Sequence, residues 1–116
     1  HLANLRVLSV SGTRITAAGV EAVLNSPHWK LSGLRLGHCQ LRSGAVDVLA
    51  ASPGLARLQV LDLSGNDELE GTHLEPLAES EYLSPQTELD LRGVYAGAAP
   101  KVRAALRARL GRRLSE

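Results

Sequence analysis

The sequence predicts an α/β fold in which one strand–helix unit repeats along the chain. Two observations support this prediction. A frame of leucines recurs around Leu8, Leu34, Leu61 and Leu89, at intervals of 26, 27 and 28 residues. The chain also has no Phe and no Met, one Trp and two Tyr, so the core must consist of Leu, Val, Ile and Ala. Repetition at this period indicates stacked units that bury thin aliphatic layers against their neighbours. We expect a parallel sheet on a concave face and helices on a convex face.

Each unit is expected to open with a short strand around its L-x-L motif. In Leu34-Arg35-Leu36 the alternation directs both leucines inward and the arginine to the other face. Where the chain leaves the strand, a small polar side chain that turns inward can satisfy bare backbone groups. This position holds Thr13, Cys39, Asn66 or Val94. Since valine can make no such bond, we expect the last unit to be irregular.

A helix is expected after each of the first three strands. The helices cover residues 16–25, residues 43–51 and a segment that begins at Thr72. Thr16 and Ser43 are candidate N-caps, and Thr72 with Glu75 forms a capping-box pattern. An apolar side chain three residues beyond a helix-ending serine is expected to plug each junction; these are Trp29, Leu55 and Leu83.

The segment 98–114 is expected to be a C-terminal capping helix and tail. Pro100 suits a first helical turn and Gly111 a helix end. The stripe Val102, Leu106 and Leu110 gives the helix one apolar side. A stack of repeats needs such a terminal unit, because its last member has no neighbour to cover it.

The frame L-x-x-L-x-L-x-x-N/C/T-x-L resembles that of leucine-rich repeat proteins. The resemblance implies a leucine-rich repeat solenoid, a right-handed βα superhelix, and the helix in every unit makes it similar to the ribonuclease-inhibitor-like subclass. Ser52-Pro53-Gly54-Leu55 is similar to the repeat junctions of bacterial leucine-rich repeat proteins that carry a repeat-companion domain. Departures are Val94 in the polar column and Ser80-Glu81 in place of Ser-Pro.

The chain as a whole is expected to be a single leucine-rich repeat domain, residues 1–116. Its opening residues overlay Gly54 to Leu61, which follow the end of a helix. We therefore expect the C-terminal piece of a longer protein, whose uncovered first strand near Leu8 and Val10 lets it self-associate. The excess of arginine over lysine favours a bacterial source.

Composition and motifs indicate no catalytic chemistry. The net charge of +1 selects no class of partner. The four histidines show no metal-ligand spacing, and we expect no cofactor and no enzyme. His38 and Cys39 are adjacent in sequence but should point in different directions, which disfavours a nucleophilic pair. The single cysteine requires no oxidising compartment, and no apolar run suits a membrane span, so we expect a cytoplasmic protein.

The candidate site is the outward face of the strands. Its central column should hold Ser9, Arg35, Asp62 and Asp90, which lie at equivalent positions of the four frames. The column before it should hold Val7, Gly33, Val60 and Glu88, and the column after it Ser11, Gly37, Ser64 and Arg92. We expect an unidentified protein partner to bind there through Ser9, Arg35, His38, Asp62, Asp90 and Arg92. Asp62 and Asp90 should form a solvated pair, balanced by Arg35 and Arg92.

Two other functions stay open at this stage. The chain could be the substrate-recognition arm of a larger enzyme or effector. It could also bind an anion, in nucleic acid or lipid, through the six basic residues between Lys101 and Arg113. Nucleic acid is not the expected partner, because this segment has no aromatic side chain on which bases would stack.

Overall fold

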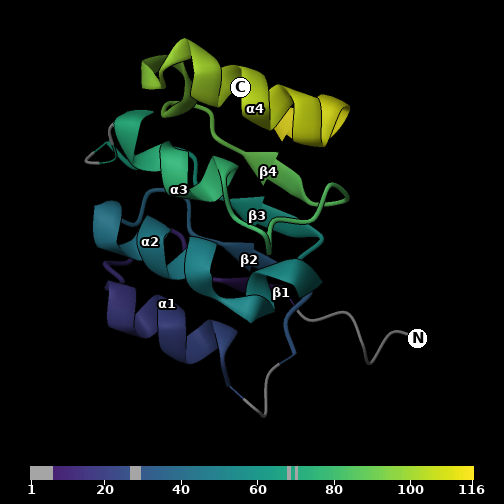
Figure 1. Ribbon diagram of the computed structural model, residues 1–116. Helices are drawn as coiled ribbons and strands as arrows, with labels where there is room; N and C mark the ends of the chain where they lie inside the picture. The colour runs from purple at the N-terminus through teal and green to yellow at the C-terminus, as the bar shows by residue number, and fades with distance from the viewer. Residues whose placement is uncertain (1–6, 27–29, 68, 70) are drawn as a thin grey trace.

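The computed structural model describes residues 7–26, 30–67, 69 and 71–116. The expected plug residue Trp29 lies outside these residues. Figure 1 shows two layers, with the helices stacked in one and the strands in the other. The strands form one parallel sheet in chain order: β1 (Val7–Ser9), β2 (Gly33–Arg35), β3 (Val60–Asp62), β4 (Glu88–Asp90) and β5 (Leu114–Ser115).

The register of the sheet follows the leucine frame. Leu8 is paired with Leu34, Leu34 with Leu61, and Leu61 with Leu89. Leu34, Leu61 and Leu89 are almost completely buried, and Leu36, Leu63 and Leu91 repeat the pattern two residues later. The column of stacked aliphatic side chains predicted from the sequence is therefore confirmed, and it lies between the strands and the helices.

The helices differ more from the prediction than the strands do. They are α1 (Ala17–Leu24), α2 (Ser43–Ala51), α3 (Glu75–Ala78) and α4 (Pro100–Leu110). Short 3-10 helices cover Pro53–Arg57, Gly71–Leu74, Tyr95–Gly97 and Gly111–Arg113. The junction side chains Leu55 and Leu83 are buried as expected.

Two of the predicted helix starts are wrong. Thr16 does cap α1, since its hydroxyl oxygen accepts a hydrogen bond from the Gly19 amide at 3.3 Å. Ser43, in contrast, is the first residue of α2, and the cap position is Arg42, whose side chain makes no capping bond. The α-helix α3 begins at Glu75 rather than at Thr72, because the chain first makes a 3-10 turn.

The four-strand expectation is also wrong, because the tail adds a fifth strand. After α4 the chain returns to the sheet and pairs Leu114 with Leu89 and Ser115 with Asp90. The Leu91 amide donates to the Ser115 carbonyl at 2.9 Å. Leu114 is buried, so it covers the end of the leucine column.

Asn66 joins the second and third units through a buried amide side chain. Its Oδ1 accepts hydrogen bonds from the amides of Cys39 (2.8 Å) and Leu41 (3.1 Å). Its Nδ2 donates to the carbonyls of Leu36 (3.0 Å) and Leu63 (2.8 Å). The expected role of this position, satisfying backbone groups where the strand ends, is thus confirmed for Asn66.

The other members of this column behave as their chemistry dictates. The Cys39 thiol is buried and donates to the Val10 carbonyl at 3.1 Å, so it points inward as predicted. The Thr13 hydroxyl donates to the same carbonyl at 2.6 Å. Val94 is buried without a polar group, and an irregular 3-10 turn follows it, as expected of the last unit.

We predict that Asn66→Ala lowers the free energy of unfolding by about 3 kcal/mol, because it leaves two amides and two carbonyls unpaired in the core. Thr13→Ala is the matched control at the equivalent exposed position, and it should cost less than about 1 kcal/mol. Urea denaturation followed by circular dichroism measures both. Equal losses for the two variants would contradict the assigned role of Asn66.

We also predict that the protein self-associates through β1. Val7, on this edge strand, is 56% exposed. Val7→Lys should weaken association about tenfold, since burying a valine side chain contributes roughly 1.5 kcal/mol and edge charges oppose strand pairing. Sedimentation velocity over a concentration series measures the effect. A wild-type protein that stays monomeric at high concentration would refute the prediction.

Candidate protein-binding face

The outward side of the sheet carries the predicted columns of side chains. We call it the strand face and define it by its central column, Ser9, Arg35, Asp62 and Asp90. Strand pairing places Ser9 beside Arg35, Arg35 beside Asp62, and Asp62 beside Asp90. The column before it contains Val7, Gly33, Val60 and Glu88 in the same register. The predicted geometry of both columns is therefore confirmed, while the binding of a partner there stays a prediction.

The buried leucines hold these polar side chains in place. Arg35, Asp62 and Asp90 each lie between two buried residues of their own chain segment, which anchor the strand against the helix layer. The backbone ladder continues past the strands, since the Leu36 amide donates to the Asp62 carbonyl at 2.8 Å. The strand face is thus attached to a packed core, and its own side chains contribute little to that core.

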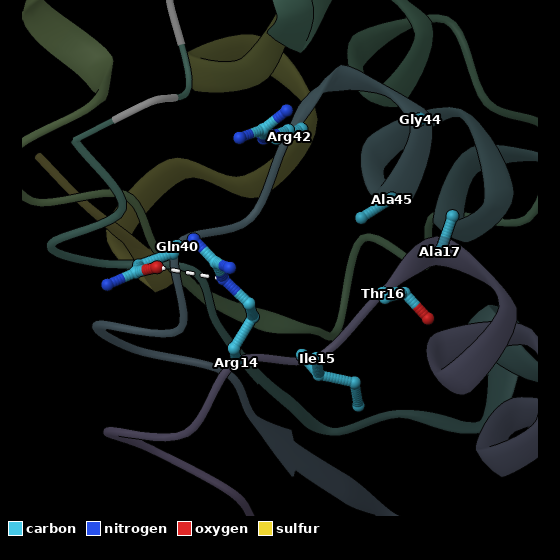
Figure 2. Close-up of a pocket in the computed structure, with 8 residues that line it drawn as sticks. All are labelled: Arg14, Ile15, Thr16, Ala17, Gln40, Arg42, Gly44 and Ala45. Carbon is cyan, nitrogen blue, oxygen red and sulfur yellow. Dashed lines mark hydrogen bonds between the residues drawn. The ribbon is translucent and has the colours of Figure 1, made fainter.

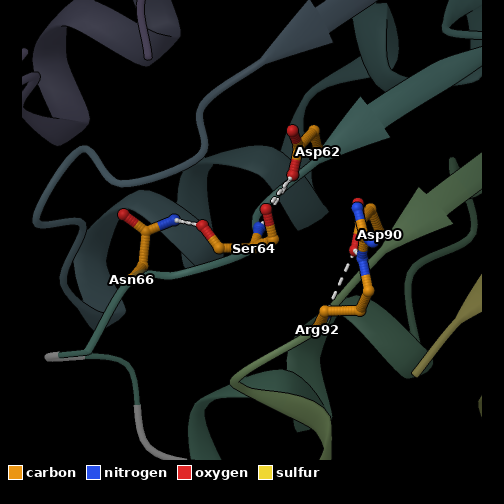
Figure 3. A network of polar contacts seen from close by, with 5 residues as sticks. All are labelled: Asp62, Ser64, Asn66, Asp90 and Arg92. Carbon is orange, nitrogen blue, oxygen red and sulfur yellow. Dashed lines mark hydrogen bonds and ion pairs between the residues drawn. The ribbon is translucent and has the colours of Figure 1, made fainter. Parts of the chain in front are cut away.

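Asp62 is tied into the turn that follows β3. Its Oδ1 accepts hydrogen bonds from the amide (2.9 Å) and the hydroxyl (2.6 Å) of Ser64. Figure 3 shows this contact beside the Asp90–Arg92 pair on the next strand. A Cβ at Gly37 would come within 3.2 Å of Asp62 Oδ2, so the small residue leaves room for the carboxylate. The sequence signal for this contact is the Asp-x-Ser spacing at the strand end.

Asp90 forms an ion pair with Arg92, two residues along the chain. Arg92 Nη2 lies 2.7 Å from Asp90 Oδ2, and Arg92 Nε donates to Asp90 Oδ1 at 3.0 Å. The hydrogen bond from the Arg92 side chain is the main reason that the pKa of Asp90 lies below its usual value. Arg35 adds a weaker favourable charge. The expected balancing of Asp90 by Arg92 is confirmed, and it is intramolecular.

His38 lies at the rim of the strand face. It is exposed and has a positive φ of 54°, and its amide donates to the Ser64 carbonyl at 2.9 Å. Its ring lies so close to Gly65 that a Cβ there would collide with it. Since Cys39 points into the core, the two side chains do not form a nucleophilic pair.

The tail adds site residues that the sequence analysis missed. Ser115 extends the central column beyond Asp90. An open hollow of about 180 Å³ lies over β3 to β5, lined by Arg35, Val60, Asp62, Glu88, Leu89, Asp90 and Ser115. A wider hollow of about 450 Å³ adjoins it, lined by Glu88, Arg112, Arg113 and Ser115. The available signal was the repeat itself, because Leu114 follows Leu89 by 25 residues, close to the earlier intervals.

Part of the basic C-terminal segment is engaged within the molecule. Arg107 pairs with Glu116 at 2.9 Å, and its guanidinium lies 5.6 Å from the centre of the Tyr95 ring. Arg109 donates to the Ser80 carbonyl at 2.6 Å and to the Ala78 carbonyl at 3.3 Å. These contacts tie α4 to the third unit and to the tail. They leave fewer of the six basic side chains for an anion than the sequence alone suggests.

A second groove, of about 410 Å³, lies away from the strand face where α1 and α2 begin. Figure 2 shows its lining, in which Ile15, Ala17 and Ala45 form an apolar wall. Arg14 Nε donates to Gln40 Oε1 at 3.0 Å across the two turns. This contact links the first unit to the second. Among the described residues, no cluster of three His, Cys, Asp or Glu side chains is arranged to hold a metal ion.

We predict that Arg92→Gln raises the pKa of Asp90 toward its ordinary value. A depressed folded-state pKa stabilises the protein at pH values above the unfolded pKa, and that stability is lost as the pH falls through the folded pKa. The variant should therefore be less stable than the wild type near neutral pH, and the difference should vanish in acid. Titration of the Asp90 side-chain carbon by NMR measures the pKa, with Arg57→Gln as the control. An unchanged Asp90 titration in Arg92→Gln would refute the assignment.

Comparison with known proteins agrees with the repeating unit. Residues 1–24 match a family model described as Leucine Rich repeat. No curated protein and no solved structure matches the chain. Leucine-rich repeats generally mediate protein–protein interaction and are typically non-catalytic binding scaffolds. No helix in the described part of the chain is long and apolar enough to cross a membrane. The match and the parallel sheet with its helices together support a leucine-rich repeat protein.

Proposed function

We propose that this protein is a non-catalytic interaction scaffold that binds a protein partner on its strand face. In this proposal the units form a solenoid of the ribonuclease-inhibitor-like subclass, with the strand face on its concave side. The whole chain acts as one domain, and α4 with its tail caps the end of the stack. The resemblance to bacterial repeat proteins with a companion domain extends the proposal to a cytoplasmic, bacterial setting.

One observation carries the proposal: polar side chains stand in register on a sheet whose other side is packed. Ser9, Arg35, Asp62 and Asp90 occupy adjacent strands, and substitution at these positions would leave the buried leucines untouched. A rigid surface of this kind pays little entropy on binding, because its backbone is already ordered. Together with His38 at the rim and Arg92 beside Asp90, these residues form the proposed partner-binding set.

The proposed scaffold differs from the two alternatives in what it requires of its surroundings. A recognition arm of a larger enzyme or effector would use the same face, but would deliver its partner to a catalytic domain. An anion-binding module would instead use the C-terminal bases. The internal contacts of Arg107 and Arg109 favour a structural role for that segment.

The proposal is tested by placing a photoreactive amino acid on each layer of the molecule. We predict that the residue at position 35, on the strand face, cross-links to a discrete protein partner in cells. The same residue at position 47, where Asp47 is exposed on α2, should give no such product. Mass spectrometry identifies the cross-linked species. Cross-links confined to position 47, or absent from position 35, would overturn the strand face as the binding surface.

A further inference from the structure

The unpaired charges of the strand face gather at its β2–β5 end. Among the described residues, Arg35, Glu88, Arg112 and Arg113 have no side-chain hydrogen bond or ion pair. Asp62 uses only one of its carboxylate oxygens, in the bonds to Ser64. Charges elsewhere in the molecule, such as Arg107 and Arg109, are occupied by internal partners. The unpaired groups are therefore the ones that can exchange water for a partner without breaking a contact.

These groups line one continuous depression. The hollow that contains Arg35 and Asp62 and the hollow that contains Arg112 and Arg113 share Glu88 and Ser115 in their linings. The pairing of Leu89 with Leu114 places Glu88 and Arg113 at neighbouring positions of adjacent strands. The depression thus runs across the strands, from β2 to the residues that lead into β5.

The charges along this depression alternate in sign. Arg35 on β2 is positive, Asp62 on β3 and Glu88 on β4 are negative, and Arg112 and Arg113 before β5 are positive. Neighbouring strands lie about 4.8 Å apart, so β2 and β5 are separated by about 14 Å. In an extended peptide, side chains on one side recur about every 6.7 Å, so residues i, i+2 and i+4 span about 13 Å. The spacing of the charges therefore suits three alternate side chains of an extended segment.

We infer that the strand face binds an extended segment of its protein partner that crosses the strands and carries an acidic-x-basic-x-acidic pattern. The basic side chain lies over Asp62 and Glu88. One acidic side chain faces Arg35, and the other faces Arg112 and Arg113. This inference rests on the proposed function and adds to it the chemistry of the partner. Charge complementarity of this kind selects partners and fixes their register more than it adds affinity.

The probes that test the inference are two synthetic heptapeptides of equal composition and charge. The first, SDTKTDS, has the alternating pattern, and the second, SDDTTKS, has the same residues in a different order. We predict that the first binds about tenfold more tightly at low ionic strength, because three charge pairs form only with the alternating order. Titration followed by NMR gives both affinities and should shift the backbone amides of β2 to β5.

A matched pair of variants distinguishes local contacts from net charge. Arg113→Glu should reduce the preference for the alternating peptide to about twofold or less. Arg57→Glu makes the same change in net charge at an exposed position outside both hollows, and it should leave the preference intact. Equal binding of the two peptides, binding of neither peptide, or equal effects of the two variants would overturn the inference. In those cases a retained cross-link at position 35 keeps the scaffold proposal, and its loss removes both.

Discussion

The structure depends on the stacking of equivalent leucines from consecutive units. A three-residue strand cannot persist alone, since it buries too little apolar surface to offset the entropy of ordering its backbone. Leu34, Leu61 and Leu89 solve this by packing in a column in which each buries its neighbour. The column requires a parallel register without slippage, because a shift of one residue would turn every leucine toward water. Each strand therefore owes its position to the units beside it.

The turns after the strands show how chemistry varies within this constraint. The chain must leave each strand with its backbone groups paired, although the core excludes water. Asn66 meets this need with one acceptor and one amide group that reach two units. Cys39 and Thr13 meet it only in part, each donating to the Val10 carbonyl. Val94 cannot meet it at all, so the backbone must turn irregularly there.

The strand columns could be predicted from the sequence because both of their causes are local. A period of two in each strand and a repeat of 26 to 28 residues together determine which side chains are neighbours. Helix starts were predicted less well. Ser43 satisfies the residue preference of a cap, yet α2 begins one residue earlier than that assignment requires. The tail was missed as a strand because two residues show no alternation, and only its pairing with β4 makes it extended.

The charged side chains were the hardest to predict, since their partners depend on geometry that the repeat does not encode. The sequence showed six bases near the C-terminus but could not separate those bound internally from those that face the sheet. Arg107 and Arg109 lie on the helix, where Glu116 and the Ser80 carbonyl are within reach. Arg112 and Arg113 follow it, where the chain turns back to the sheet, and they lie beside Glu88.

The fifth strand thus has two consequences that arise from one chain reversal. Leu114 extends the aliphatic column, so the tail contributes to the stability of the last full unit. The same reversal brings two arginines to a face whose other charges come from the repeats. Stability and surface chemistry are encoded in alternate residues of one short segment, as they are in β2, β3 and β4. For this reason the charge pattern of the strand face could change by substitution at Arg35, Asp62 or Arg113 while the leucine column, and with it the register, stayed the same.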